Sequence, residues 1–226
     1  MVNKYYMFCL ALSIGAFSCA TSAQKIVYDN TSTPVSGQHL SGGTYPFSFY
    51  ADGETTGEAV TLAGTERKIV QFDLLLAAGE ATTIDSLTLR FWAMDGEYAD
   101  DVDNPIWESD PVLGLELTET PPDQPHVLSI PVPNVFVPDT FIWGVTADSD
   151  VAGLVTYDPP TVGSSEDGFW NVDSDGNQYT LWLGADPVTN FGARIHTPEP
   201  ATLATLAFGA LLAPRNGRRG RRRRAP

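Results

Sequence analysis

Short segments in which apolar and polar residues alternate recur along the middle of the chain, between residues 24 and 196. A period of two is typical of strands that bury one face. Turn signals such as Asp95-Gly96 and Asp175-Gly176 separate the segments. No window of helical length shows an equally regular 3.6-residue period, so this region is predicted to be all-β. The predicted strands are 26–29, 45–50, 58–62, 68–76, 86–94, 112–118, 127–132, 141–147, 153–157, 168–172, 179–183 and 192–196.

Many short strands with this punctuation predict a single β-sandwich, jelly-roll-like in arrangement. An immunoglobulin-type arrangement without its cysteine pair is the alternative. Eight of the 17 prolines lie between Asn104 and Pro138, so this stretch is expected to form connections and edge strands.

Three of the predicted strands have clear faces. The inward residues are expected to be Val70, Phe72, Leu74 and Leu76, then Leu87, Leu89 and Phe91, then Tyr179, Leu181 and Leu183. Trp92 and Trp182 fall on the opposite faces of their strands. Flat aromatic rings beside polar groups can stack against sugars, so both are candidates for glycan binding. The alternatives are that loops cover them, or that the register is shifted by one residue.

Residues 1–23 have the features of a secretory signal peptide. Lys4 gives a positive start, residues 7–17 are apolar, and Thr21-Ser22-Ala23 offers small residues for cleavage after Ala23. Both cysteines, Cys9 and Cys19, lie in this segment. The exported chain is therefore expected to fold without disulfides or thiolate metal ligands.

Residues 197–226 form a third region. Pro198, Glu199 and Pro200 precede an apolar stretch, 201–213, which an arginine cluster follows; its members are Arg215, Arg218, Arg219, Arg221, Arg222, Arg223 and Arg224. A helix of these 13 apolar residues would be about 20 Å long, against roughly 30 Å of bilayer hydrocarbon. This favours transient membrane association over permanent anchoring. Because basic residues stay on the cytoplasmic side, the domain before them would lie outside, in agreement with the N-terminal signal.

The order of these three features resembles the tail of the PEP-CTERM family, over about residues 197–224. The resemblance implies that an exosortase, an integral-membrane cysteine enzyme, recognises Pro198, Glu199 and Pro200. The exosortase would cut near them and release or transfer the domain to the cell surface, after an inner-membrane intermediate. The family is common in bacteria that make exopolysaccharide. The apolar segment here is shorter than the family pattern and is closed by Pro214. A basic tail for nucleic acid or anionic lipid is the alternative explanation of the arginines.

The charge is divided unevenly along the chain. Residues 24–196 carry 5 Lys and Arg against 27 Asp and Glu, whereas residues 197–226 carry 7 Arg against one Glu, and the whole chain has a formal charge of −15. An acidic domain of this strength repels phosphates, which excludes nucleic acid as its expected partner.

Two acidic segments are candidate calcium-binding sites. Calcium is the one cofactor that the sequence suggests. The first contains Asp95, Glu97, Asp100, Asp101 and Asp103, which repel one another unless solvated or neutralised by a cation. The second contains Asn171, Asp173 and Asp175 before Gly176, which is like the start of a calcium loop. Trp182 stands where such a loop requires glutamate. A solvated loop and a glycine-turned hairpin are the alternatives.

Catalytic patterns are weak in the sequence. His39, His126 and His196 are isolated, and there is no Gly-x-Ser-x-Gly elbow. The sequence therefore predicts a non-catalytic, exported cell-surface or extracellular-matrix protein, with extracellular polysaccharide and calcium as candidate ligands. The alternative is a secreted polysaccharide-active glycoside hydrolase on a jelly-roll, using carboxylates such as Asp95 or Glu97.

Overall fold

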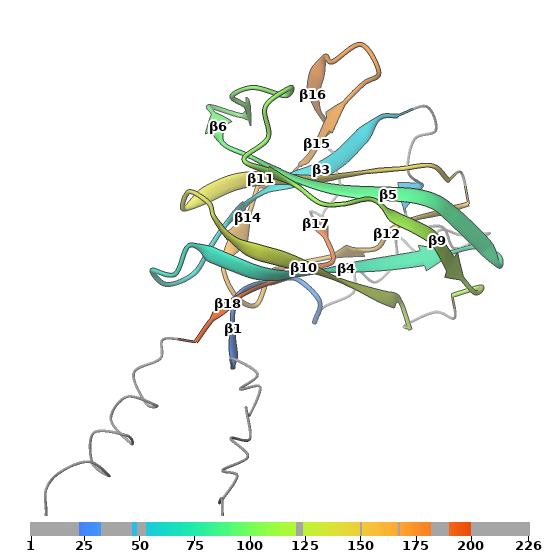
Figure 1. Cartoon of the computed structure of the whole chain (residues 1–226), viewed down its shortest axis with the longest axis horizontal. Helices are drawn as coiled ribbons and strands as arrows, with labels where there is room; N and C mark the ends of the chain where they lie inside the picture. Colours follow the sequence, from blue (N-terminus) through green and yellow to red (C-terminus); the bar gives the residue numbers. More distant parts are fainter. Residues whose placement is uncertain are drawn as a thin grey trace, which may run out of the picture.

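A computed structural model describes residues 23–32, 47–48, 53–120, 124–149, 151–166, 168–181 and 190–199. Within them the chain forms antiparallel strands and no helix, and two sheets face each other across a common core (Figure 1). The predicted all-β sandwich is confirmed. Most of the predicted signal peptide and the chain from Pro200 onward lie outside the described residues. In the described part, no helix is long and apolar enough to cross a membrane.

The first sheet is built on β4 (Lys68–Ala78). Along one edge of β4 runs β10 (His126–Phe136). Apart from β10, the strand order across the sheet is β1 (Gln24–Asp29), β18 (Ala193–Pro198), β4, β12 (Ala152–Leu154) and β2 (Phe47–Ser48).

The second sheet has the order β16 (Gln178–Leu181), β15 (Phe169–Val172), β3 (Thr55–Thr61), β11 (Thr140–Ala147), β5 (Thr82–Trp92) and β8 (Trp107–Glu108). Two further strands pair with its members: β14 (Ser164–Ser165) with β3, and β9 (Val112–Leu117) with β5. Two short pairs complete the fold, β6 (Met94–Asp95) with β7 (Tyr98–Ala99), and β13 (Thr156–Tyr157) with β17 (Asn190–Phe191).

The main core lies between the sheets and contains most of the predicted inward residues. Phe72 of β4 packs against Phe91 of β5 and Trp143 of β11, with ring centroids 5.6 and 5.1 Å apart. Ile69 takes the inward place predicted for Val70, which is half-buried. The pairing of β4 with β10 is irregular at this point, and the period of two is lost there. Tyr179 and Leu181 are half-buried, and Leu183 lies outside the described residues.

The proline-rich stretch contributes a long strand where the sequence predicts a shorter one. β10 continues past residue 132 to Phe136, although Pro131 and Pro133 cannot donate ladder hydrogen bonds. The strand accommodates them because it pairs with β4 along one side, and because the register shifts between Pro131 and Val135, where Asn134 has a φ of 57°.

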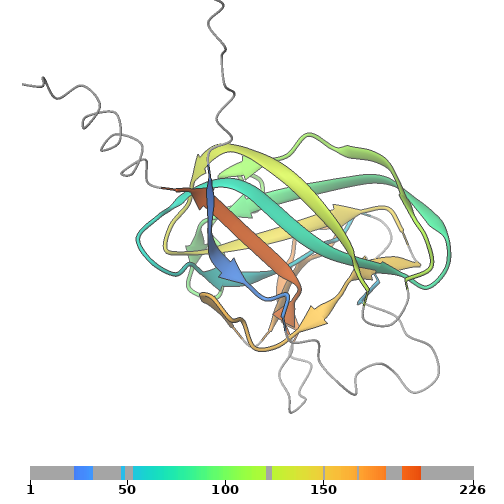
Figure 2. The ribbon, with the colours of Figure 1, turned by 90° about the horizontal axis from the view of Figure 1, so that it is seen from below.

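The two ends of the described domain lie side by side. β1 pairs antiparallel with β18, with Gln24 opposite Pro198 and Lys25 opposite Thr197. Figure 2 shows the two strands next to each other in the first sheet, with β1 at its edge. β18 runs through Pro198, two residues beyond the domain boundary expected from the sequence. The start and the end of the sandwich are therefore at the same end of the molecule.

Candidate functional site

Trp92 lies on the predicted face of β5, but it does not offer its ring to a ligand. Its side chain is 2% exposed and packs against Trp170 with ring centroids 4.8 Å apart. Its indole N–H donates to the carbonyl of Val102, in the loop that follows β7. The alternative of a covering loop is the correct one for Trp92, because a second apolar cluster forms on this face of the sheet. Trp182 lies outside the described residues.

The first acidic segment forms the β6–β7 hairpin and the loop after it. Asp95, Glu97, Asp100, Asp101 and Asp103 are all exposed. The Asp101 carboxylate accepts hydrogen bonds from the backbone N–H of Asp103 and the side-chain amide of Asn104, and these bonds lower its pKa. This carboxylate therefore stabilises its own loop.

The second acidic segment is a hairpin between β15 and β16. Asn171 is buried in β15, where it accepts from the Thr56 hydroxyl, and is thereby separated from the turn. Asp173 Oδ1 accepts from the backbone N–H groups of Asp175 and Asn177, at 3.0 and 2.8 Å. The Asn177 side chain and backbone bonds lower the pKa of Asp173. In the described part of the chain, no three His, Cys, Asp or Glu side chains are grouped to hold a metal ion. Calcium binding stays a prediction.

A cleft that the sequence does not predict opens between the two sheets. It has a volume of about 590 Å³ and lies where β8 and the start of β9 face β10. Half-buried Trp107 packs on the core ring of Phe91, with centroids 4.9 Å apart, and forms part of the lining. Exposed Asp110 and Ser129 and the prolines of β10 line it as well. An aromatic ring therefore lies beside residues that carry carboxylates, Glu108 and Asp110.

The wall that carries Trp107 is fixed by bonds to β5. Glu108 forms an ion pair with Arg90, which also donates to the Thr146 hydroxyl over 2.7 Å. The next residue, Ser109, is buried, and its hydroxyl accepts the Leu89 N–H at 3.0 Å. The sequence signal for this wall is a tryptophan followed by acidic and hydroxyl residues, within a proline-rich stretch that predicts connections and edge strands.

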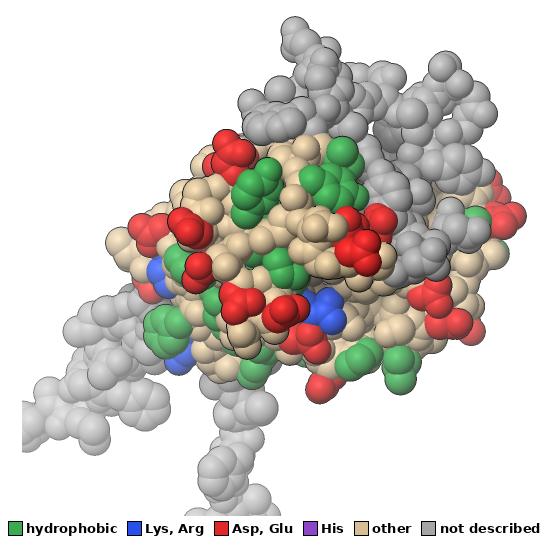
Figure 3. Space-filling view, turned by 90° about the horizontal axis from the view of Figure 1, so that it is seen from above, with side chains coloured by type: hydrophobic (Ala, Val, Ile, Leu, Met, Phe, Trp, Pro, Cys, Tyr) green, Lys and Arg blue, Asp and Glu red, His purple; other side chains and the backbone are tan. Residues whose placement is uncertain are grey.

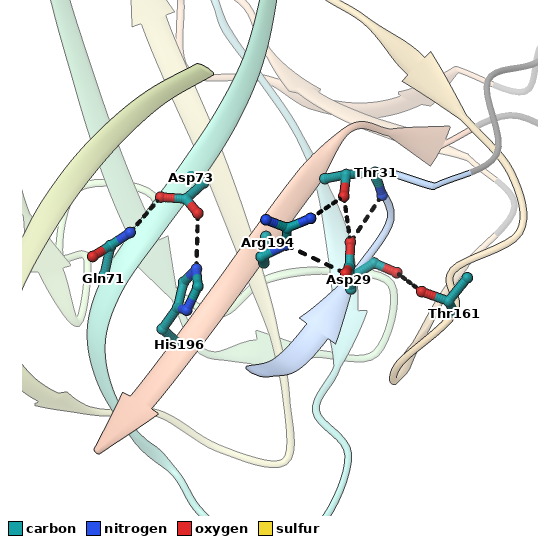
Figure 4. A network of polar contacts seen from close by, with 7 residues as sticks. All are labelled: Asp29, Thr31, Gln71, Asp73, Thr161, Arg194 and His196. Atoms are coloured by element: carbon teal, nitrogen blue, oxygen red, sulfur yellow. Dashed lines mark hydrogen bonds and ion pairs between the residues drawn. The ribbon is translucent and has the colours of Figure 1, made fainter. Parts of the chain in front are cut away.

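A second polar arrangement lies on the outer side of the first sheet (Figure 4). His196 Nε2 and Asp73 Oδ2 are 2.8 Å apart, and the Gln71 amide donates to the other oxygen of Asp73. Burial raises the pKa of Asp73, but hydrogen bonds, the one from His196 foremost, outweigh it and lower the pKa overall. Beside them, Arg194 pairs with Asp29 at 3.3 Å. These bonds link β1, β18 and β4.

The segment that the sequence identifies as a sorting motif is partly described. Pro198 ends β18, and the backbone N–H of Glu199 donates to the carbonyl of Ala23 over 2.8 Å. Glu199 is exposed. Pro200 and the arginine cluster lie outside the described residues. The structure thus joins the predicted cleavage site of the signal peptide to the first two residues of the motif.

Acidic groups are spread over the outer side of the second sheet, and basic groups are few there (Figure 3).

Comparison with known proteins adds no assignment: no family model, no curated protein and no solved structure matches the chain.

Proposed function

We propose that this chain is a non-catalytic, exported surface protein that an exosortase sorts through its C-terminal tail, and that its sandwich binds extracellular polysaccharide in the Trp107 cleft. The observation that supports the proposal is the pairing of β1 with β18, which brings Ala23, at the end of the predicted signal peptide, and Glu199, in the predicted sorting motif, to one end of the domain. A sandwich with this geometry can fold outside the membrane while both of its ends still point toward it.

The cleft chemistry supports polysaccharide as the ligand class. An indole ring gives a flat apolar contact, and the neighbouring carboxylate oxygens accept hydrogen bonds from sugar hydroxyls. No Lys or Arg is among the described residues that line the cleft, and the nearby Arg90 is paired with Glu108. Because the domain is strongly acidic, we expect uncharged polysaccharide to bind in preference to anionic polymers.

The ligand is tested with the exported protein and a panel of uncharged and anionic bacterial polysaccharides. Trp107→Ala and Asp110→Asn should each weaken binding at least ten-fold. Asp110→Asn leaves the core packing untouched, so it separates binding from folding. Phe136→Ala is the matched control, because this ring is 68% exposed on β10 and is not among the residues that line the cleft. Absence of binding to every uncharged polymer would refute the ligand assignment.

The sorting is tested by following the tail in cells that contain an exosortase. Glu199→Ala should leave the protein as a membrane-associated form that retains its C-terminus, whereas Glu80→Ala, in the exposed β4–β5 turn, should be processed normally. A wild-type protein found in the cytoplasm with both ends intact would refute the proposal.

The hydrolase alternative is favoured by one observation, that Glu108 and Asp110 both line the cleft. It predicts release of reducing ends from a bound polysaccharide, abolished by Glu108→Gln or Asp110→Asn. Asp95 and Glu97 lie on the β6–β7 hairpin and are not among the residues that line the cleft. Binding of a polysaccharide without release of reducing ends would contradict the hydrolase alternative and support the non-catalytic function.

A further inference from the structure

The hydrogen bond from Glu199 to Ala23 crosses between the two segments that processing would remove. Ala23 is the residue after which the signal peptide is expected to be cut, and Glu199 is the centre of the sorting motif. The bond is 2.8 Å long and continues the antiparallel ladder of β1 and β18 by one step. The acceptor, the carbonyl of Ala23, belongs to the predicted signal peptide. If export precedes sorting, this segment is removed before the sorting motif is cut.

We infer that removal of the signal peptide frees the sorting motif from the sheet, so that the C-terminal cut is faster after the N-terminal one. This inference rests on the proposed function. Hydrolysis of the Ala23–Gln24 peptide bond adds one water: the new carboxylate leaves on Ala23, and the new ammonium stays on Gln24. The ammonium is a donor, so it cannot replace the lost carbonyl as acceptor for Glu199.

The alternation of the ladder makes the motif dependent on this bond. Hydrogen-bonded and non-hydrogen-bonded pairs alternate in an antiparallel ladder, and the Gln24–Pro198 pair is of the second kind, so the missing N–H of Pro198 removes no bond to β1. The Ala23–Glu199 pair is therefore the next hydrogen-bonded pair after Lys25–Thr197. When Ala23 is lost, the ladder ends at the Lys25–Thr197 pair. Thr197 remains buried at its place in β18 and marks the end of the fixed strand.

An enzyme that cuts near the motif must take it as an extended chain free of other strands. The loss of one hydrogen bond of ordinary strength raises the population of an open strand end roughly two- to ten-fold. The uncut precursor is thus a poorer substrate for the C-terminal step, which breaks a peptide bond and passes the acyl group to water or an acceptor amine. A protein that still carries its signal peptide would therefore lose its tail more slowly.

The test follows both cuts by pulse labelling in cells that contain the exosortase. Ala23→Phe blocks the first cut, because a bulky residue stands at −1, yet it keeps the backbone carbonyl. Ala23 is exposed, so the larger side chain does not disturb the fold. We expect the tail of this variant to be cut roughly two- to ten-fold more slowly than in wild type. Ala23→Ser is the matched control and should behave as wild type.

The double variant Ala23→Phe, Lys25→Pro distinguishes the effect of the strand pairing on the cutting rate from the effect of the retained signal peptide itself. Proline at position 25 disrupts the Lys25–Thr197 pair, the hydrogen-bonded pair next to Ala23–Glu199, so the tail should again be cut at the wild-type rate although the signal peptide remains. Slow cutting in both variants would show that the signal peptide itself hinders the enzyme, and would overturn the inference. Equal rates in wild type and Ala23→Phe would also overturn it. A wild-type tail that is never cut would overturn the proposed sorting as well.

Discussion

The hydroxyl of Tyr28 donates a hydrogen bond to Glu58 Oε1 over 3.0 Å, and so joins β1 of the first sheet to β3 of the second through the interior. Glu58 is completely buried, and its Oε2 accepts the backbone N–H of Phe191 at 2.9 Å. Its register partner Trp143 also buries its indole N–H beside this carboxyl group, where the N–H favours the charged form of Glu58. A carboxyl group thus stands fully buried among core rings, with donors around it that only partly offset the cost of burying its charge.

Burial raises the pKa of Glu58 from 4.5 to about 8, although the Phe191 N–H and the Tyr28 hydroxyl favour the charged form. The folded protein therefore holds a proton that the unfolded chain releases above about pH 4.5. Stability should fall as the pH rises from about 4.5 to about 8, by on the order of a few kcal/mol, and then level off. Glu58→Gln removes this dependence, because its amide can donate to Tyr28 and accept from Phe191 in an uncharged state.

Urea unfolding at pH 5, 6.5 and 8 checks this prediction. The variant should be close to wild type at pH 5 and more stable than wild type at pH 8. Glu80→Gln, an exposed carboxyl in the β4–β5 turn, should leave the wild-type slope unchanged. If the curves for wild type and Glu58→Gln run parallel, Glu58 is ionised in the folded state and the prediction is wrong.

Alternation along the chain was sufficient to predict the sandwich and the inward faces of its best strands. Leu87, Leu89 and Phe91 are all fully buried, as their spacing predicts. The same spacing places Glu58 on the face of Val60, which is a core residue. A buried carboxyl could therefore be suspected from the sequence of β3, but its donors come from β1 and β17, which local pattern cannot bring together.

The candidate sites are harder to predict than the strands, because their geometry depends on residues far apart in the sequence. Which residues cover Trp92 is decided by Trp170, Val102 and the β6–β7 hairpin, none of which the pattern of β5 can identify. The Trp107 cleft likewise exists because β8 and β10, from different sheets, end up facing each other. The predicted signal peptide and sorting tail can be recognised from the sequence, because their composition and the order of their features are characteristic. The contact of Ala23 with Glu199 cannot, because it depends on the register of β1 on β18.

Asp73 is expected to stabilise the first sheet toward neutral pH. The pKa of its carboxyl is lowered on folding, chiefly by the hydrogen bond from His196, against the effect of burial. A lowered pKa gives stability that is present above the usual Asp value of about 3.9 and is lost as the pH falls through the folded value. Asp73→Asn should therefore be less stable than wild type at pH 7, and the difference should shrink below about pH 4.

Acid-induced unfolding followed by circular dichroism measures this difference. Asp85→Asn is the matched control, because Asp85 is exposed on β5. A gap between Asp73→Asn and wild type that persists at pH 3 would contradict the prediction, since the loss would then be one of packing rather than of charge.

Gln178 should hold the cover over Trp92 in place. Its Oε1 accepts from the Ala99 N–H and the Trp170 indole N–H, at 2.8 and 2.9 Å, and its Nε2 donates to the Ala99 carbonyl. Gln178→Ala leaves these groups without partners and should cost about 1–3 kcal/mol. It should also increase quenching of tryptophan fluorescence by acrylamide. Asn177→Ala, an exposed neighbour in the turn, should leave quenching unchanged; equal quenching in both variants would contradict the role given to Gln178.

Gly57 permits the close approach of β3 to β11 beneath the two tryptophans. A Cβ atom at this position would lie 1.8 Å from the carbonyl oxygen of Trp143 and 2.5 Å from Cα of Gly144, which are backbone atoms that cannot turn aside. Gly57→Ala must separate strands that are paired along their whole length, so we expect a loss of about 3 kcal/mol or more in the free energy of unfolding.

Gly96 provides the comparison for this variant. It has a φ of +66° but open space around it, so Gly96→Ala meets backbone strain without a clash and should cost about 1–2 kcal/mol. Urea unfolding of both variants ranks the two effects. If Gly57→Ala is no less stable than Gly96→Ala, the strands can move apart locally, and the tight contact of β3 with β11 is not what holds Trp92 and Trp170 in their buried positions.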